Sequence, residues 1–410
     1  MPATLPDVPR FRFSDPGYKR DPYAVYRRVL CGAPLVVSRR HFIGDALMVS
    51  RYDDVVRVLR DDANFSNDVR VVEGHRPPPW WVPGIIRSFQ DNMIGREGAA
   101  HRRLRGLVVR AFTPARVAAM NVGIEALVDR LLTAAAARGG AIDLIAELAL
   151  PLPLTVISDM MGVPEGDRRA FHRWMSGLLD LEGGGLFGLA GALLKMRGLL
   201  AFFRRLIALR RREPGPDLVS ALVAAEDDGD RLSEEELVNM VFLLLLAGHE
   251  TTVNLIGNGV LALLRNPDQL ARLRDEPGLI DGAIEELLRY DSPVQTPAPR
   301  YTRTDVEIAG HVVPRGVMMM AVIGAANRDP AQFPEPDRLD LGRSPNKHLA
   351  FGFGLHYCVG APLARAEARY ALLALLARFP RLRLAVAEDR LEWRRSNAIR
   401  GLAALPLHLA

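Results

Sequence analysis

The chain has 410 residues, of which 49% are hydrophobic and 25% are charged, a balance typical of a globular protein. Its net charge of +5 comes almost entirely from arginine, and no basic run is interleaved with aromatic residues, so nothing indicates nucleic-acid binding. Two cysteines are too few for a disulfide framework, which favours a cytoplasmic protein.

Helical patterns dominate from the N-terminus onward. The polar, proline-rich start lacks the apolar core of a signal peptide. Apolar residues then recur at helical spacing over residues 53–62, 101–112, 117–137, 165–181, 190–212 and 216–226. Nothing resembles a linker or a repeat, so we expect one domain over residues 1–410.

A long helix is predicted from residue 233 to about residue 264. Ser233 and Glu236 match a capping box, and about 30 residues span about 45 Å. The middle of the helix is apolar all round, so we expect it to cross the centre of the domain. Its most apolar stretch, 237–248, is shorter than a membrane-spanning helix needs, so we expect no membrane anchor.

The sequence Ala-Gly-His-Glu-Thr-Thr at 247–252 interrupts this apolar helix. A carboxylate near the centre of a domain needs a partner or a purpose, and Glu250 is followed by two threonines. The small residues would leave a groove for a small ligand. The alternative is a polar turn on a solvent-facing flank, and His249 is expected to be a packed or surface histidine.

The rest of the chain indicates a mainly α protein with a small β region. Glu286 and Arg289 share one helix face, which alone is a weak signal. Residues 306–308 and 312–313 form a predicted hairpin, residues 327–353 are expected to be irregular, and a last helix covers 362–379.

The stretch 351–362 is the most informative. Glycines flank Cys358 on both sides, and a helix follows it. Glycines allow a tight backbone path beside a flat ligand, and a helix N-terminus stabilises a thiolate. A lone thiolate suits an iron with one protein ligand, for which haem is the obvious case. The alternative is a buried structural cysteine.

This stretch resembles the haem-binding signature of the cytochrome P450 family, in the soluble bacterial form. The matching residues are Phe351, Gly354, His356, Cys358 and Gly360. The resemblance implies the cytochrome P450 fold, with the long helix over a haem b (iron protoporphyrin IX), and Cys358 as the metal ligand. It likewise makes residues 247–251 the family's acid–alcohol motif.

That motif implies specific roles. Thr251 would hold reduced oxygen and its proton-donor water, Glu250 would relay protons, and Ala247 would lie against the cofactor. The resemblance assigns a cradle for the haem propionates to His101, Arg105, Arg300 and His356. It assigns Glu286, Arg289 and Arg338 to a buried network that locks the cysteine loop. Residues 97–100 depart from the family's Asp-Pro-Pro-x, which puts the start of the following helix in question.

The implied reaction inserts one atom of O₂ into a lipophilic small molecule, by hydroxylation or epoxidation. Electrons would come from NAD(P)H through a separate ferredoxin-type donor and its reductase. The implied substrate pocket is mostly apolar and comprises Trp80, Trp81, Leu243, Val294, Ala298 and Ile399. A fatty acid, terpenoid, steroid or macrolide all remain open as substrates.

Three alternatives stay open. One is a peroxide-driven haem-thiolate hydroxylase, which the intact Glu250–Thr251 pair disfavours. A second is a non-catalytic haem-based sensor or binding protein, although no output module is visible. The third is a purely structural α protein with a chance cysteine loop.

Overall fold

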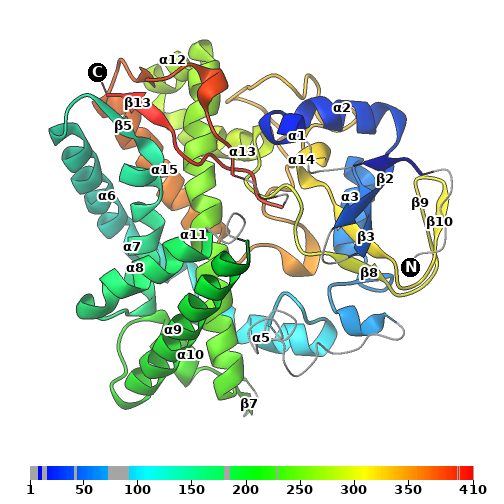
Figure 1. The fold of residues 1–410 in the computed structure, drawn as a ribbon, viewed down its shortest axis with the longest axis horizontal. Helices are drawn as coiled ribbons and strands as arrows, with labels where there is room; N and C mark the ends of the chain where they lie inside the picture. The colour runs from blue at the N-terminus through cyan, green and yellow to red at the C-terminus, as the bar shows by residue number, and fades with distance from the viewer. Residues whose placement is uncertain are drawn as a thin grey trace.

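The computed structural model describes residues 8–11, 16–40, 44–72, 92–179, 185–227, 230–394, 396 and 398–409. In Figure 1 the long helices gather on one side of the molecule and the largest sheet lies on the other. The described α-helices are α1 (Pro16–Arg20), α2 (Pro22–Gly32), α3 (Tyr52–Arg60), α5 (Gly98–Ala111), α6 (Pro114–Ala137), α7 (Pro151–Met161), α8 (Glu165–Leu179), α9 (Gly185–Arg212), α10 (Leu218–Ala224), α11 (Glu234–Arg265), α12 (Pro267–Asp275), α13 (Ile280–Tyr290), α14 (Ile323–Ala326) and α15 (Ala361–Arg378).

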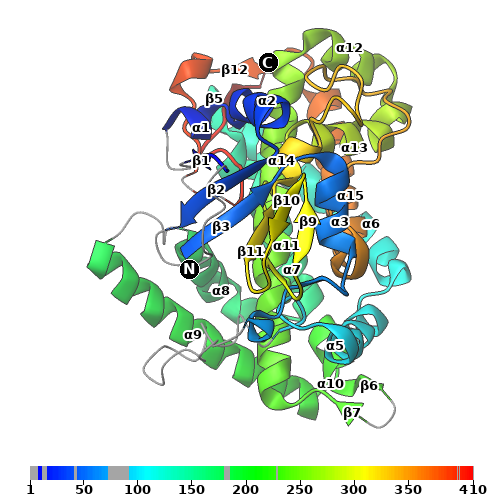
Figure 2. The same cartoon turned by 90° about the vertical axis from the view of Figure 1, so that its right-hand side faces the viewer.

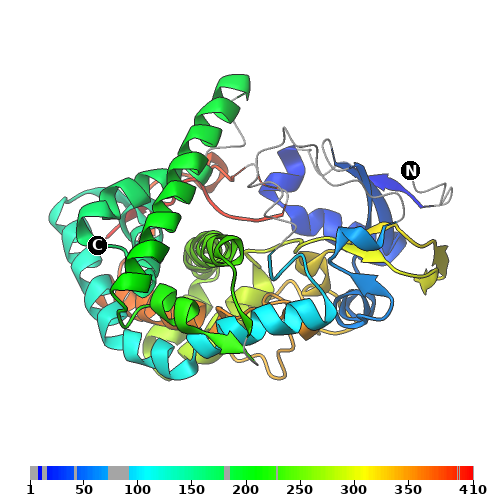
Figure 3. The same cartoon turned by 90° about the horizontal axis from the view of Figure 1, so that it is seen from below.

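Helix α11 is the predicted central helix. Its capping box is present: Ser233 Oγ accepts from the Glu236 N–H at 3.2 Å, and the Glu236 carboxylate accepts from the Ser233 N–H at 2.8 Å. Helices α7, α9, α13 and α15 pack around it, and Figure 3 shows it end-on among them. Its length and composition would allow a membrane span, but 67% of its most apolar window is buried inside the fold.

The sheet content exceeds the prediction. One sheet has six strands in the order β1-β2-β3-β11-β8-β4, seen with β2, β3 and β11 side by side in Figure 2. Residues 46–49 of β3 are all buried, so this strand lacks the alternation that marks a half-exposed strand. The strands of this sheet are β1 (Arg10–Phe11), β2 (Leu35–Arg40), β3 (Gly44–Val49), β4 (Phe65–Ser66), β8 (Arg300–Thr302) and β11 (Met318–Ala321).

The predicted hairpin is confirmed. Strands β9 (Val306–Ile308) and β10 (His311–Val313) pair antiparallel across Ala309 and Gly310, which have φ of 50° and 77°. Residues 327–353 contain no helix or strand, as expected. The smaller sheets comprise β5 (Ala141–Asp143) with β12 (Arg383–Leu384) and β13 (Pro406–His408), and β6 (Glu226–Asp227) with β7 (Asp230–Arg231). The mainly α fold class is therefore confirmed.

Short helical turns complete the chain and place the cysteine loop. The 3₁₀ turn η5 (Gly354–His356) lies in that loop and contacts α3, while α15 begins just after it. The other turns are η1 (Val69–Val71), the π-helical η2 (Ile145–Ala149), η4 (Pro277–Leu279) and η6 (Glu388–Arg390).

Candidate functional site

The cysteine loop closes on itself and on α3. The Cys358 N–H donates to the Phe351 carbonyl at 2.9 Å. Gly354 has φ of +71°, and a Cβ there would lie 3.0 Å from the Leu59 carbonyl oxygen. This glycine is therefore required both by backbone conformation and by the close approach of another chain segment.

The thiol of Cys358 is held at the start of α15. Burial raises the pKa of this thiol, while N–H bonds from Gly360 and Ala361 and the charges of Arg105 and Arg365 act to lower it. The residue nevertheless keeps an exposed side. A Cβ at Gly360 would lie 3.8 Å from the sulfur, an ordinary contact, so space around the sulfur alone does not require that glycine. The sulfur is thus supported on its helix side and accessible on another.

The turn of α11 at residues 247–252, where small and polar residues interrupt the apolar pattern, is also partly exposed. Ala247 and Gly248 are exposed although most of the helix around them is buried. The Thr251 hydroxyl donates to the Ala247 carbonyl at 2.9 Å, one turn back along the helix. Glu250 is half-buried. The helix therefore presents small side chains and an alcohol at its accessible turn.

His249 is expected to be either packed or at the surface, and the structure shows that it is packed. It is completely buried, and its Nδ1 lies 3.0 Å from the Leu245 carbonyl oxygen. Burial lowers its pKa to about 4, so the ring is neutral near pH 7.

Glu367 is a buried carboxyl group that the sequence analysis missed. It lies on α15 with 2% of its surface exposed, and burial raises its pKa to about 8 although a hydrogen bond with Thr252 acts to lower it. Its sequence context is an ordinary helix with a mixed pattern, which gave no signal that this position faces the core.

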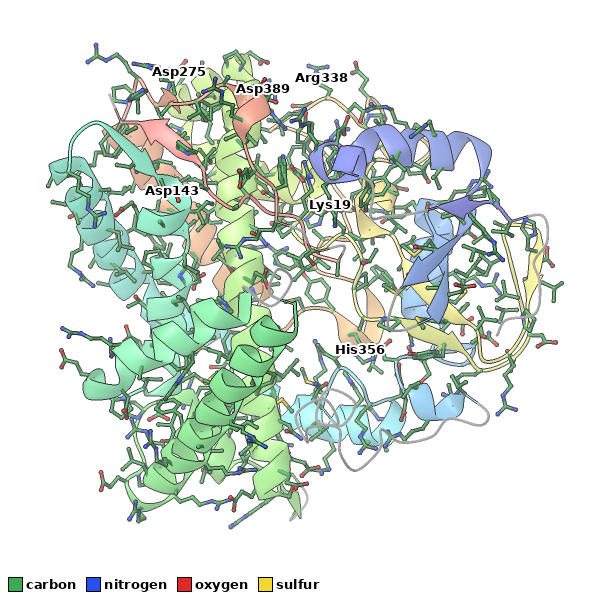
Figure 4. The ribbon with its side chains drawn as sticks, viewed as in Figure 1. Lys19, Asp143, Asp275, Arg338, His356 and Asp389 are labelled. Carbon is green, nitrogen blue, oxygen red and sulfur yellow. The ribbon has the colours of Figure 1, made fainter. Side chains whose placement is uncertain are left out.

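The predicted cradle residues on α5 reach the cysteine loop. The His101 ring is buried, with Nδ1 2.8 Å from the Met93 carbonyl oxygen, and its centroid lies 4.3 Å from that of His356. Arg105 donates to the Tyr357 carbonyl at 2.7 Å. Figure 4 shows His356 near the ribbon of α5. His101, Arg105 and His356 therefore form one cluster beside Cys358.

Arg300 joins this cluster through an acid. Its buried guanidinium donates to the carboxylate of Asp62 at 2.9 Å and to that of Glu97 at 3.1 Å. The same Glu97 oxygen lies 3.2 Å from His356 Nε2. Burial acts to raise the pKa of Glu97, but hydrogen bonds from His356 and the Asn67 N–H, with the charge of Arg300, lower it overall. In the sequence, Glu97 stands out only as part of the departure from the family pattern at residues 97–100.

The departure at 97–100 has a structural consequence. Glu97 is extended, Gly98 has φ of +59°, and α5 begins there, three residues before the predicted start. Proline cannot adopt a positive φ, so the Asp-Pro-Pro form of this turn is incompatible with the backbone seen at Gly98.

The residues of this cluster fit a haem. His101 Nε2 and Arg300 Nε are buried and have no hydrogen-bond partner among the described residues. Unpaired buried polar nitrogens of this kind are costly unless a ligand or water satisfies them. The Arg300 Nε–H is a donor, and His101 Nε2 becomes one when the ring is protonated, because Nδ1 already faces the Met93 carbonyl. Two such nitrogens beside an accessible thiol match a cofactor that carries carboxylates and needs one sulfur ligand.

Comparisons with known proteins decide the family. The family model described as cytochrome P450 matches residues 200–392. The chain is 44% identical over 407 residues to cytochrome P450 107B1 of Saccharopolyspora erythraea, covering 98% of this chain and 99% of that protein. The chain belongs to the cytochrome P450 family. It is therefore a haem-dependent, oxygen-incorporating oxidoreductase, a haem-thiolate mono-oxygenase.

Two further relatives of this P450 extend the likeness. This chain is 40% identical to the 6-deoxyerythronolide B hydroxylase of Saccharopolyspora erythraea, with 99% of both chains covered. The solved structure of the bacillaene polyketide synthase cytochrome P450 PksS from Bacillus subtilis superposes with a TM-score of 0.90 at 38% identity. That match covers 98% of this chain and 100% of the other.

The network behind the cysteine loop differs from the prediction at one position. Arg289 binds both Glu286 oxygens, as expected. Arg338, however, has a side chain that is 59% exposed and pairs with Glu335 at 3.1 Å. Arg343 takes its place, with Nε 3.2 Å from both oxygens of Glu286. The chain passes Glu286 at Asp340, whose N–H donates to it at 3.0 Å, so the later arginine is the one within reach.

The pocket residues predicted for the P450 are partly brought together. Val294 and Ile399 face each other in an isolated antiparallel bridge, and both are half-buried. Ala298 is also half-buried, while Leu243 on α11 is 6% exposed. Trp80 and Trp81 lie outside the described residues.

Proposed function

We propose that this cytochrome P450 oxidises a lipophilic, polyketide-type small molecule by hydroxylation or epoxidation. Two relatives support the substrate class, since one is named for 6-deoxyerythronolide B and the other for a polyketide synthase. The apolar character of Leu243, Val294 and Ile399 supports a lipophilic ligand.

The observation that carries the proposal is the support given to the Cys358 sulfur. Two backbone N–H groups at the start of α15 stabilise a thiolate there, and one side of the residue is accessible. Cys358 would hold the iron of haem b, with Phe351, Gly354 and Gly360 shaping the loop. His101, Arg105, Arg300 and His356 would hold its propionates. The haem supplies the activation of O₂ when it is bound.

The chain's own groups would handle protons and position the substrate. The Thr251 hydroxyl, which donates to the Ala247 carbonyl, would hold a proton-donor water at the accessible turn of α11. Glu250 would exchange protons with that water as general acid and base. Ala247 lacks a bulky side chain and so leaves room for cofactor and substrate. Glu286, Arg289 and Arg343 hold the loop region that presents the thiol.

A ferredoxin-type protein and its reductase would deliver electrons from NAD(P)H, the whole chain 1–410 would act as one catalytic domain, and the enzyme would work in the cytoplasm. The mild positive charge of the chain suits an acidic electron donor.

Spectroscopy and turnover test the proposal. The purified holoenzyme should show the thiolate-ligated band with carbon monoxide, and Cys358→Ala should lose it. Macrolactone intermediates should shift the haem spin state and be converted to mono-oxygenated products with NAD(P)H, ferredoxin and reductase. A thiolate band with no response to any macrolactone would reject the substrate class. Products formed with peroxide alone, and none with O₂ plus the electron donors, would reject the electron route.

A further inference from the structure

Glu97 places a carboxylate inside the cluster of arginines and histidines assigned to the haem propionates. Its side chain is 9% exposed. One oxygen accepts from Arg300 Nη2 at 3.1 Å, from the Asn67 N–H at 2.8 Å and from His356 Nε2 at 3.2 Å. The other oxygen is buried and has no partner among the described residues. The carboxylate is therefore built into the protein interior.

Arg300 has little capacity left for another acid. Its Nη1 donates to the Val58 and Leu59 carbonyls at 3.0 and 2.7 Å. Its Nη2 donates to the Phe65 carbonyl as well as to Asp62 and Glu97. Only Nε lacks a partner within the described residues. The charge of Arg300 is thus already balanced by two carboxylates of the protein.

The two carboxylates differ in their surroundings. The Asp62 side chain is 43% exposed, so water and salt screen its charge. Glu97 is shielded and also engages His356, which belongs to the cysteine loop. A haem propionate approaching Arg300 and His356 would therefore meet the field of Glu97 at short range and that of Asp62 only weakly.

We propose that Glu97 competes with one haem propionate for Arg300 and His356, so that this P450 holds its haem less tightly and at a lower reduction potential than the same cradle without that charge. Two carboxylates that share Arg300 and His356 repel each other, which weakens retention of the propionate. An extra negative charge near the iron also favours the oxidised state. The proposal uses the cradle of the proposed function but not its substrate class.

Glu97→Gln is the test, because glutamine keeps the shape and the acceptor for the Asn67 N–H but removes the charge. The holoenzyme should lose haem to excess apomyoglobin more slowly, by about three- to tenfold, as expected for removal of a nearby like charge in a partly screened site. A spectroelectrochemical titration should show a more positive midpoint potential. Asp62→Asn is the matched control and should change both quantities less.

Unchanged or faster haem loss in Glu97→Gln, or an unchanged or more negative potential, would overturn the proposal and make Glu97 an organiser of the cradle. Should the glutamine variant not fold, Glu97→Asp withdraws the carboxylate from Arg300 and His356 and should also slow haem loss. Equal or faster loss from that variant would equally overturn it. The carbon monoxide band of each variant reports thiolate ligation separately, so a failure of the proposed haem site would be seen as such.

Discussion

Arg289 and Glu286 form a bidentate ion pair with no exposed surface on either side chain: Nε and Nη2 lie 2.7 and 2.8 Å from the two carboxylate oxygens. Arg289 also donates to the carbonyls of Asn327, Pro336 and Arg338. The pair therefore ties α13 to the irregular segment that leads to the cysteine loop. Because both charges are buried, the second cation that reaches Glu286 is energetically important.

Replacing Arg343 should destabilise the protein far more than replacing Arg338. Arg343→Gln removes from Glu286 a cation whose side chain is 10% exposed, and it should cost about 3 kcal/mol of unfolding free energy, as for other broken buried pairs. Arg338→Gln is the matched control and should cost less than about 0.5 kcal/mol, because its pair with Glu335 is solvent-exposed. Chemical unfolding of the holoenzyme measures both. Equal losses would show that Arg338, as the sequence indicated, is the residue that supports Glu286.

Two glycines of the cysteine loop should respond differently to alanine. Gly354→Ala places a Cβ 3.0 Å from the Leu59 carbonyl oxygen at φ of +71°, and neither backbone segment can move without disturbing η5 or α3. We expect a loss of about 1–3 kcal/mol in unfolding free energy. Gly360→Ala, where the new Cβ meets only the Cys358 sulfur at 3.8 Å, should cost clearly less. The order of the two unfolding midpoints checks this, and the reverse order would contradict it.

The sequence predicted features whose signal is local. The capping box of Ser233 and Glu236 lies within one turn, so α11 could be placed correctly. The loop around Cys358 carries its glycines within a few residues of the sulfur. Arg343 could not be chosen over Arg338, because the path of residues 327–353 follows no repeating pattern.

Features that depend on distant partners were missed for the same reason. Glu97 contacts Arg300 on β8 and His356 in η5, which are 203 and 259 positions away in the chain, so its own sequence context does not show its role. The carboxyl group of Glu367 looks like an ordinary helical position until α15 is packed against α11. Burial of both faces removed the alternation that would have marked β3.

The Thr251 hydroxyl should control how efficiently electrons are used. Thr251→Ala removes the only side-chain oxygen at that position and with it the hydrogen bond to the Ala247 carbonyl. Without a held proton-donor water, we expect NAD(P)H consumption to continue while product per NAD(P)H falls by about tenfold or more. Thr251→Ser is the control, since it keeps the hydroxyl and should retain most of the coupling. Comparable coupling in the alanine and wild-type enzymes would remove Thr251 from the proton route.

Glu367 should make the stability of the protein depend on pH. Its pKa is about 8 in the folded chain against 4.5 for an ordinary glutamate, so the folded state binds the proton more tightly than the unfolded state. Below pH 4.5 both states are protonated and the group has no cost. Between pH 4.5 and 8 the unfolded state gains by ionising, and stability falls by up to about 1.4 kcal/mol per pH unit. Above pH 8 the cost is constant.

Glu367→Gln should therefore leave stability unchanged near pH 4 and raise it near pH 8, by up to about 4 kcal/mol. Glu285→Gln provides a control of opposite sign. Burial acts to raise the pKa of Glu285, but hydrogen bonds from Arg365 and His348 lower it to about 2. Its contribution is present above pH 4.5 and is lost as the pH falls toward 2, so this variant should be destabilised near pH 7 and less so in acid. Urea unfolding of both holoenzyme variants at a series of pH values measures the two slopes. A pH-independent difference between Glu367→Gln and wild type would mean that Glu367 is not held protonated in the core.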